Sequence, residues 1–82
     1  MAGHHRGTRG VPRGLPKDWR KLAERMRTVG FVFEDGRRVK AFAPDGRTIL
    51  TLQKTPSTQG SLERTRALFR RWCRQNGIEP EV

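Results

Sequence analysis

Two stretches of the chain repeat their apolar residues at three- and four-residue steps, the pattern of an amphipathic helix. The first begins near Pro16, which suits a first helical turn, and ends before Gly30, which suits a helix terminus. Its predicted buried stripe is Trp19, Leu22, Ala23, Met26 and Val29. The second covers residues 61–76 and is followed by Gly77. Its predicted stripe is Leu62, Thr65, Leu68, Phe69, Trp72 and Cys73.

Three short runs between these helices are predicted as strands: residues 31–34, 37–43 and 48–53. Asp35-Gly36 is typical of a two-residue hairpin loop, and Pro44-Asp45-Gly46 is typical of a second turn. The sequence therefore predicts an α+β domain of order α-β-β-β-α with a three-stranded antiparallel sheet. Because nothing else remains to cover the apolar stripes, both helices are expected on one face of the sheet. The other face is expected to be at least partly open.

The two ends of the chain differ in composition from the predicted domain, which covers residues 16–78. Residues 1–15 are rich in glycine and arginine. Such a segment buries too little apolar surface to offset the entropy of ordering it, so we expect a disordered basic arm. Residues 79–82 are expected to fray.

The net charge of the chain indicates which classes of partner it can bind. The 82 residues carry a formal charge of +10, from 18 Lys and Arg against 8 Asp and Glu. A positive field over the surface favours polyanions, with RNA or DNA first and an acidic protein second. No apolar run reaches transmembrane length and no signal peptide is recognisable, so we expect a cytoplasmic protein without a membrane partner. The single cysteine, Cys73, excludes an internal disulfide, and its place on an apolar stripe predicts a buried, unreactive thiol.

The face of the second helix opposite its apolar stripe is almost entirely arginine. Glu63 is the only acid in this helix, whereas a merely solvated face, the alternative interpretation, usually mixes charges. Arginine pairs bidentately with phosphate. On the second strand, Arg38, Lys40 and Phe42 share one face. The residues predicted to bind nucleic acid are Arg37, Arg38, Lys40, Lys54, Arg64, Arg66, Arg70, Arg71 and Arg74.

The residues themselves indicate no enzyme. Both histidines, His4 and His5, lie in the predicted arm, so the predicted domain offers no histidine as a general base. The glycines form neither a dinucleotide-binding motif nor a Walker loop. We therefore expect no cofactor, no metal and no small-molecule substrate.

Residues 22–78 nevertheless resemble a known family, through "LAERMRTVGF", "GRRVKAFAPDGRTILTL" and a terminal helix ending in "RQNGI". The stretch is similar to the HicA toxins, small mRNA interferases of bacterial toxin–antitoxin systems with a double-stranded-RNA-binding-like fold. That family has a Gly-Ser-His signature on its second strand. Gly36 matches the glycine, Arg37 falls at the serine and Arg38 at the histidine. The resemblance implies this fold and binding of RNA.

Arg38 stands where the family has a histidine, and this difference affects the expected catalysis but not the expected binding. The family's histidine is its catalytic residue, and a guanidinium group does not give up its proton near neutral pH. We therefore predict a non-catalytic module that binds RNA, including double-stranded RNA, or DNA. The alternatives are a HicA-type ribonuclease toxin and a basic protein that docks an acidic, antitoxin-like partner.

Overall fold

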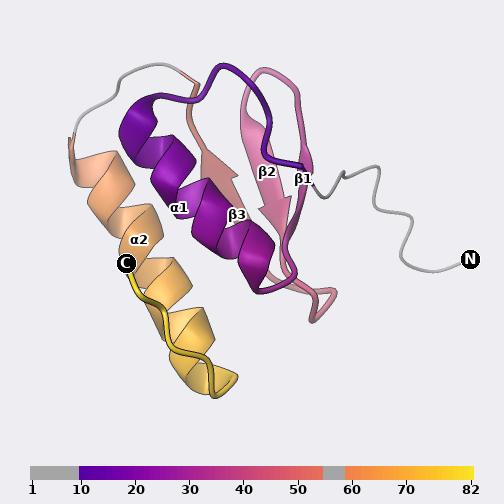
Figure 1. Ribbon diagram of the computed structural model, residues 1–82, viewed down its shortest axis with the longest axis vertical. Helices are drawn as coiled ribbons and strands as arrows, with labels where there is room; N and C mark the ends of the chain where they lie inside the picture. The colour runs from indigo at the N-terminus through magenta and orange to yellow at the C-terminus, as the bar shows by residue number, and fades with distance from the viewer. Residues whose placement is uncertain (1–9, 55–58) are drawn as a thin grey trace, which may run out of the picture.

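The computed structural model describes residues 10–54 and 59–82. Its elements are α1 (Lys17–Thr28), β1 (Val32–Glu34), β2 (Val39–Phe42), β3 (Ile49–Leu52) and α2 (Gln59–Gln75). The strands form an antiparallel sheet in the order β1-β2-β3. The helices lie next to each other on one side of the sheet, with α2 beside β3 (Figure 1). The predicted α+β class and α-β-β-β-α order are confirmed.

The core forms between the helices and the covered face of the sheet. Strand alternation turns Val39 and Ala41 inward, and the predicted α1 stripe is buried from Trp19 to Met26. At the centre, the ring of Phe31 meets the rings of Phe69 and Trp72 edge-on, with centroid distances of 5.7 and 4.8 Å. These contacts fix α2 against the start of β1.

The opposite face of the sheet is not covered by either helix. Its residues form two rows across the strands, and none of them is buried: Val32, Phe42 and Ile49 in the first, and Glu34, Lys40 and Thr51 in the second. Ile49 is 55% exposed, the largest exposure among the described large hydrophobic residues. The prediction of a partly open sheet face is therefore confirmed.

The first hairpin differs from the prediction. Residues 35–38 connect β1 to β2, so the two-residue loop expected at Asp35-Gly36 is wrong. A tight turn of that type needs positive φ at both central residues, and Gly36 does not have it. The longer loop takes up Arg37 and Arg38, which had been predicted at the start of the second strand. The second turn forms as predicted, with Gly46 at φ +77°.

Two expectations about burial are also corrected. Leu68 is 47% exposed, so the buried stripe of the second helix is narrower than predicted. The predicted arm extends too far, because Leu15 is buried in the core and Val11 packs against it. Residues 1–9 of that arm lie outside the described part of the chain.

The C-terminal residues 79–82 are docked, so the expected fraying is wrong for them. After Gly77 (φ +69°) the chain turns back along the helices (Figure 1). Arg25 of α1 donates from Nε to the Pro80 carbonyl oxygen at 3.0 Å, and Arg70 of α2 donates from Nε to the Val82 oxygen at 2.6 Å. Arginines from both helices thus hold the tail, a role that the apolar pattern does not reveal.

Candidate nucleic-acid interface

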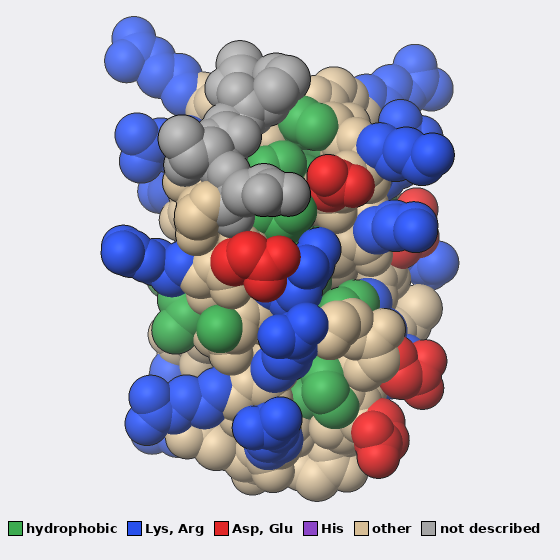
Figure 2. All heavy atoms as spheres, turned by 90° about the vertical axis from the view of Figure 1, so that its left-hand side faces the viewer, with side chains coloured by type: hydrophobic (Ala, Val, Ile, Leu, Met, Phe, Trp, Pro, Cys, Tyr) green, Lys and Arg blue, Asp and Glu red, His purple; other side chains and the backbone are tan. Residues whose placement is uncertain are grey.

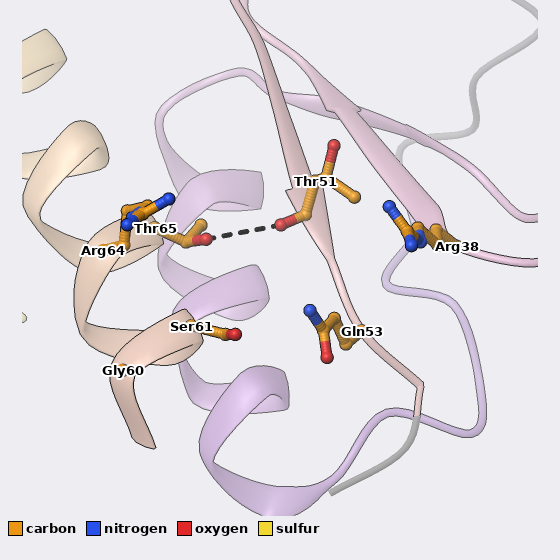
Figure 3. A pocket seen from close by; sticks show the side chains of 7 residues that line it. All are labelled: Arg38, Thr51, Gln53, Gly60, Ser61, Arg64 and Thr65. Atoms are coloured by element: carbon orange, nitrogen blue, oxygen red, sulfur yellow. Dashed lines mark hydrogen bonds between the residues drawn. The ribbon is translucent and has the colours of Figure 1, made fainter. Parts of the chain in front are cut away.

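A groove runs between β3 and the first turns of α2. It encloses about 430 Å³. The residues that line it come from the first hairpin loop, from β3 and the residue after it, and from α2 (Figure 3): Arg38, Thr51, Gln53, Gly60, Ser61, Arg64 and Thr65. Its lining is mostly polar, with two arginines and no carboxylate.

Two local features position the walls of this groove. Along β3, the alternation that buries Leu50 and Leu52 turns Thr51 outward. On α2, Thr65 is buried and its Oγ1 donates to the Thr51 carbonyl oxygen at 3.4 Å. This bond links the helix to the backbone of the edge strand.

Arg38 and Arg64 stand on opposite sides of the groove (Figure 3). Both side chains are exposed, and neither makes a hydrogen bond or ion pair with any residue that the structure describes. A guanidinium group stays protonated and presents several donors in a planar fork. The groove therefore offers two permanent cations whose donors are available to a ligand.

A second hollow of about 200 Å³ continues from the first, because the two share Arg38 and Gln53. Arg37 and Lys54 complete its lining. The Lys54 ammonium group pairs with the carboxylate of Asp35. Four of the predicted residues, Arg37, Arg38, Lys54 and Arg64, are thus brought together along one continuous depression.

The remaining predicted residues are not part of this depression. Arg66 pairs with Glu63 at 2.7 Å, and Arg70 binds the tail. Arg71 and Arg74 are exposed, and Arg74 lines a separate hollow beside the tail. Lys40 is exposed on the open sheet face. From the α2 side, basic side chains line both edges of the molecule, with acidic ones among them (Figure 2).

Asp45, in the turn between β2 and β3, links the second hairpin to α2. Its Oδ1 accepts from the backbone N–H groups of Arg47 and Thr48, and its Oδ2 accepts from Thr48 Oγ1 and, at 2.9 Å, from Trp72 Nε1. These bonds, led by the Thr48 backbone N–H, hold the Asp45 pKa well below its usual range. The sequence assigned Asp45 to a turn, which is confirmed, but gave no sign of the bond to α2.

The cysteine has the environment expected from the sequence. Cys73 is fully buried, and desolvation raises its pKa, while the charge of Arg25 partly opposes that shift. The prediction of a buried thiol is confirmed. Across residues 10–54 and 59–82, no three His, Cys, Asp or Glu side chains are grouped as a metal site needs. Neither helix in that part of the chain is long and apolar enough to cross a membrane.

Sequence reasoning missed three uncharged members of the groove. Thr51 and Gln53 follow the strand pattern and carry no motif, and Thr65 was predicted only as part of the apolar stripe. The alternation along β3 does place Thr51 and Gln53 on its outer side, but nothing in the sequence pairs that side with the start of α2. Only the tertiary arrangement brings them together.

Comparison with known proteins adds no relative to this description. No protein-family model, no curated protein and no solved structure matches the sequence. The resemblance to the HicA toxins therefore stays a prediction, and the function has to be argued from the groove itself.

Proposed function

We propose that this protein is a non-catalytic nucleic-acid-binding module that holds RNA or DNA phosphates in the groove between β3 and α2, and that it acts in the cytoplasm. The observation that carries the proposal is the pair of arginines, Arg38 and Arg64, which face one groove without partners among the described residues. The +10 charge of the chain supports the same class of ligand. Titration with RNA and with DNA decides between the two ligands.

The physical basis is charge-assisted hydrogen bonding. A guanidinium group can donate two parallel N–H bonds to one phosphate, and such bonds contribute roughly 1.5–3 kcal/mol each. Each neutralised phosphate also releases condensed counterions, so binding should weaken as salt rises. The uncharged hydroxyl of Thr51, which lines the same groove, adds a further donor.

The direct test is titration of labelled RNA and DNA oligonucleotides with the purified protein at low and high salt. We expect Kd to rise steeply with salt for both. The absorbance ratio at 260 and 280 nm of protein purified without nuclease gives an independent readout, since co-purifying nucleic acid raises it. Absence of binding at low salt, or an affinity that stays flat with salt, contradicts the proposal.

Ribonuclease activity is the alternative implied by the family resemblance. The groove carries an arginine at the position of the family's histidine, and a guanidinium group does not serve as a base near neutral pH. Arg38 could still stabilise charge on a phosphate. Incubation of mRNA with the protein and with an Arg38→Ala variant decides the matter. We expect intact RNA in both, and cleavage by the unmodified protein alone would establish an enzyme.

Docking of an acidic protein partner is a second candidate, favoured by one observation. Ile49 and Leu68 are the two large hydrophobic residues that are exposed in the described part of the chain. A phosphate group offers no apolar surface to pack against these side chains, whereas protein interfaces bury such side chains beside charged rims. A pull-down that recovers an acidic protein but no nucleic acid would favour this candidate.

A further inference from the structure

Gln53 lies where the two adjoining hollows of the candidate interface meet. It lines both hollows, which meet at Gln53 and Arg38. Its side chain is half-buried, and its amide makes no hydrogen bond with the residues that the structure describes. In Figure 3 it lies in the space between Arg38 and Ser61. A polar group held in a groove without a protein partner is available to a ligand.

The amide of Gln53 has both a donor and an acceptor, and only a base edge uses both. A phosphate only accepts hydrogen bonds, so it would engage the NH2 group of Gln53 and leave the amide oxygen without a partner. A base edge presents a donor and an acceptor side by side, which an amide matches with two bonds. Thr51, which lines the same groove, has a hydroxyl that can either donate or accept.

Apolar surface for the flat face of a base lies on the same strand. Ile49 is two residues before Thr51 and so points to the same side of β3. In the sheet register it is the direct neighbour of the half-buried Phe42 on β2. Bases splayed from a strand pack on such surfaces in proteins that bind single-stranded RNA or DNA.

We propose that Gln53 contacts the edge of an unpaired base while Arg38 and Arg64 hold the flanking phosphates. This inference rests on the proposed function and extends it, because it makes the ligand a single strand and gives it a base preference. A duplex keeps its pairing edges hydrogen-bonded. Single strands are therefore expected to bind more tightly than duplexes of the same sequence.

The test compares the full chain with a Gln53→Met variant, which keeps the length of the side chain and removes its amide. Both are titrated with labelled oligo(A), oligo(C) and oligo(U) of equal length and with a matched duplex at one salt concentration. We expect the unmodified protein to prefer one base over another by about tenfold, the low end of what a bidentate contact provides. The variant should bind the three oligonucleotides almost equally. Circular dichroism confirms that it is folded.

The possible failures are distinguishable. If Gln53→Met leaves the base preference unchanged, or if the duplex binds as tightly as the single strands, the inference is wrong and the proposed function stands. If no oligonucleotide binds at low salt, the proposed function itself is wrong. An Arg38→Gln/Arg64→Gln variant serves as the matched comparison, because it should weaken binding to all three oligonucleotides together and keep their ranking.

Discussion

The two sides of α2 carry the same type of residue in different surroundings. On the β3 side, Arg64 faces the groove opposite Arg38, and neither makes a hydrogen bond or ion pair with a described residue. On the α1 side, Arg66 pairs with Glu63 at 2.7 Å and Arg70 donates to the Val82 oxygen at 2.6 Å. Arg64 is therefore available to a ligand, whereas Arg66 and Arg70 already bind groups within the protein.

This difference shows why the number of arginines on a helix overestimates how many of them can bind a ligand. An arginine that already satisfies its donors within the protein must give up those bonds before it binds a phosphate. Arg66 and Arg70 are accordingly half-buried, whereas Arg38 and Arg64 are exposed. We therefore divide the nine predicted contacts into a groove set and an outer set, and the experiments below separate them.

The largest effect should come from removing the two groove arginines. We expect the Arg38→Gln/Arg64→Gln variant to bind single-stranded RNA about 100-fold more weakly, roughly tenfold for each lost charge-assisted contact. Fluorescence anisotropy titration measures this. The matched control, Arg66→Gln/Arg70→Gln, removes the same charge and should weaken binding less than threefold. Equal losses in both variants would abolish the distinction between the two sides.

The next effect concerns the docked tail and the stability of the fold. Arg25 holds the tail through the carbonyl oxygens of Glu79 and Pro80 and lies 3.6 Å from the Glu81 carboxylate. We expect Arg25→Gln to lower the free energy of unfolding by about 1–3 kcal/mol, since charged hydrogen bonds are lost, and to leave RNA affinity unchanged within twofold. Urea denaturation and anisotropy measure the two quantities. Arg20→Gln on the exposed side of α1 removes the same charge and should leave stability unchanged.

A smaller effect is expected where α2 meets the second hairpin. Trp72→Phe keeps an aromatic ring beside Phe31 and removes the Nε1–H donor to Asp45. We expect a fall in Tm of roughly 4–8 °C, the shift that a lost hydrogen bond produces in a domain of this size. In an Asp45→Ala background the same substitution should change Tm much less, because residue 45 then has no side-chain acceptor. An equal fall in both backgrounds would assign the effect to packing alone.

The smallest effect is a change of stability with pH. The pKa of Asp45 lies well below its ordinary 3.8 in the folded protein, so the folded state holds fewer protons than the unfolded state. Its contribution is therefore complete above about pH 4 and is lost as the pH falls toward the folded-state pKa. We expect Tm to fall as the pH is lowered from about 4 to about 2, and to fall less in Asp45→Asn. An identical pH profile for the two proteins would rule out this role.

The sequence predicted the order of elements because local patterns determine them. The stripes from Trp19 to Met26 and from Leu62 to Cys73 each mark one helix, and alternation around Val39 marks the central strand. Local rules predicted less well at the first hairpin. Asp35-Gly36 favours a tight turn in isolation, but the register that buries Phe33 opposite Ala41 requires a longer loop.

The interface was predictable only in part, for a physical reason. Charge and helix geometry identified Arg38 and Arg64 separately, but their meeting across one groove depends on how α2 packs beside β3. The same packing adds Gln53, which has no motif of its own. Arg66 is not available to a ligand because it pairs with Glu63, and Arg70 is not available because it binds the tail. Such long-range contacts are not encoded in spacing along the chain.

The dependence of RNA affinity on salt shows whether Arg38 and Arg64, and not Arg66 and Arg70, neutralise the phosphates. The slope of log K against log salt counts neutralised phosphates, at about 0.7 per phosphate for single strands. We predict that Arg38→Gln/Arg64→Gln flattens the slope by about 1.4, and that Arg66→Gln/Arg70→Gln keeps the slope of the unmodified protein. The reverse result, a full slope in the groove variant and a flattened one in the outer variant, would contradict the account.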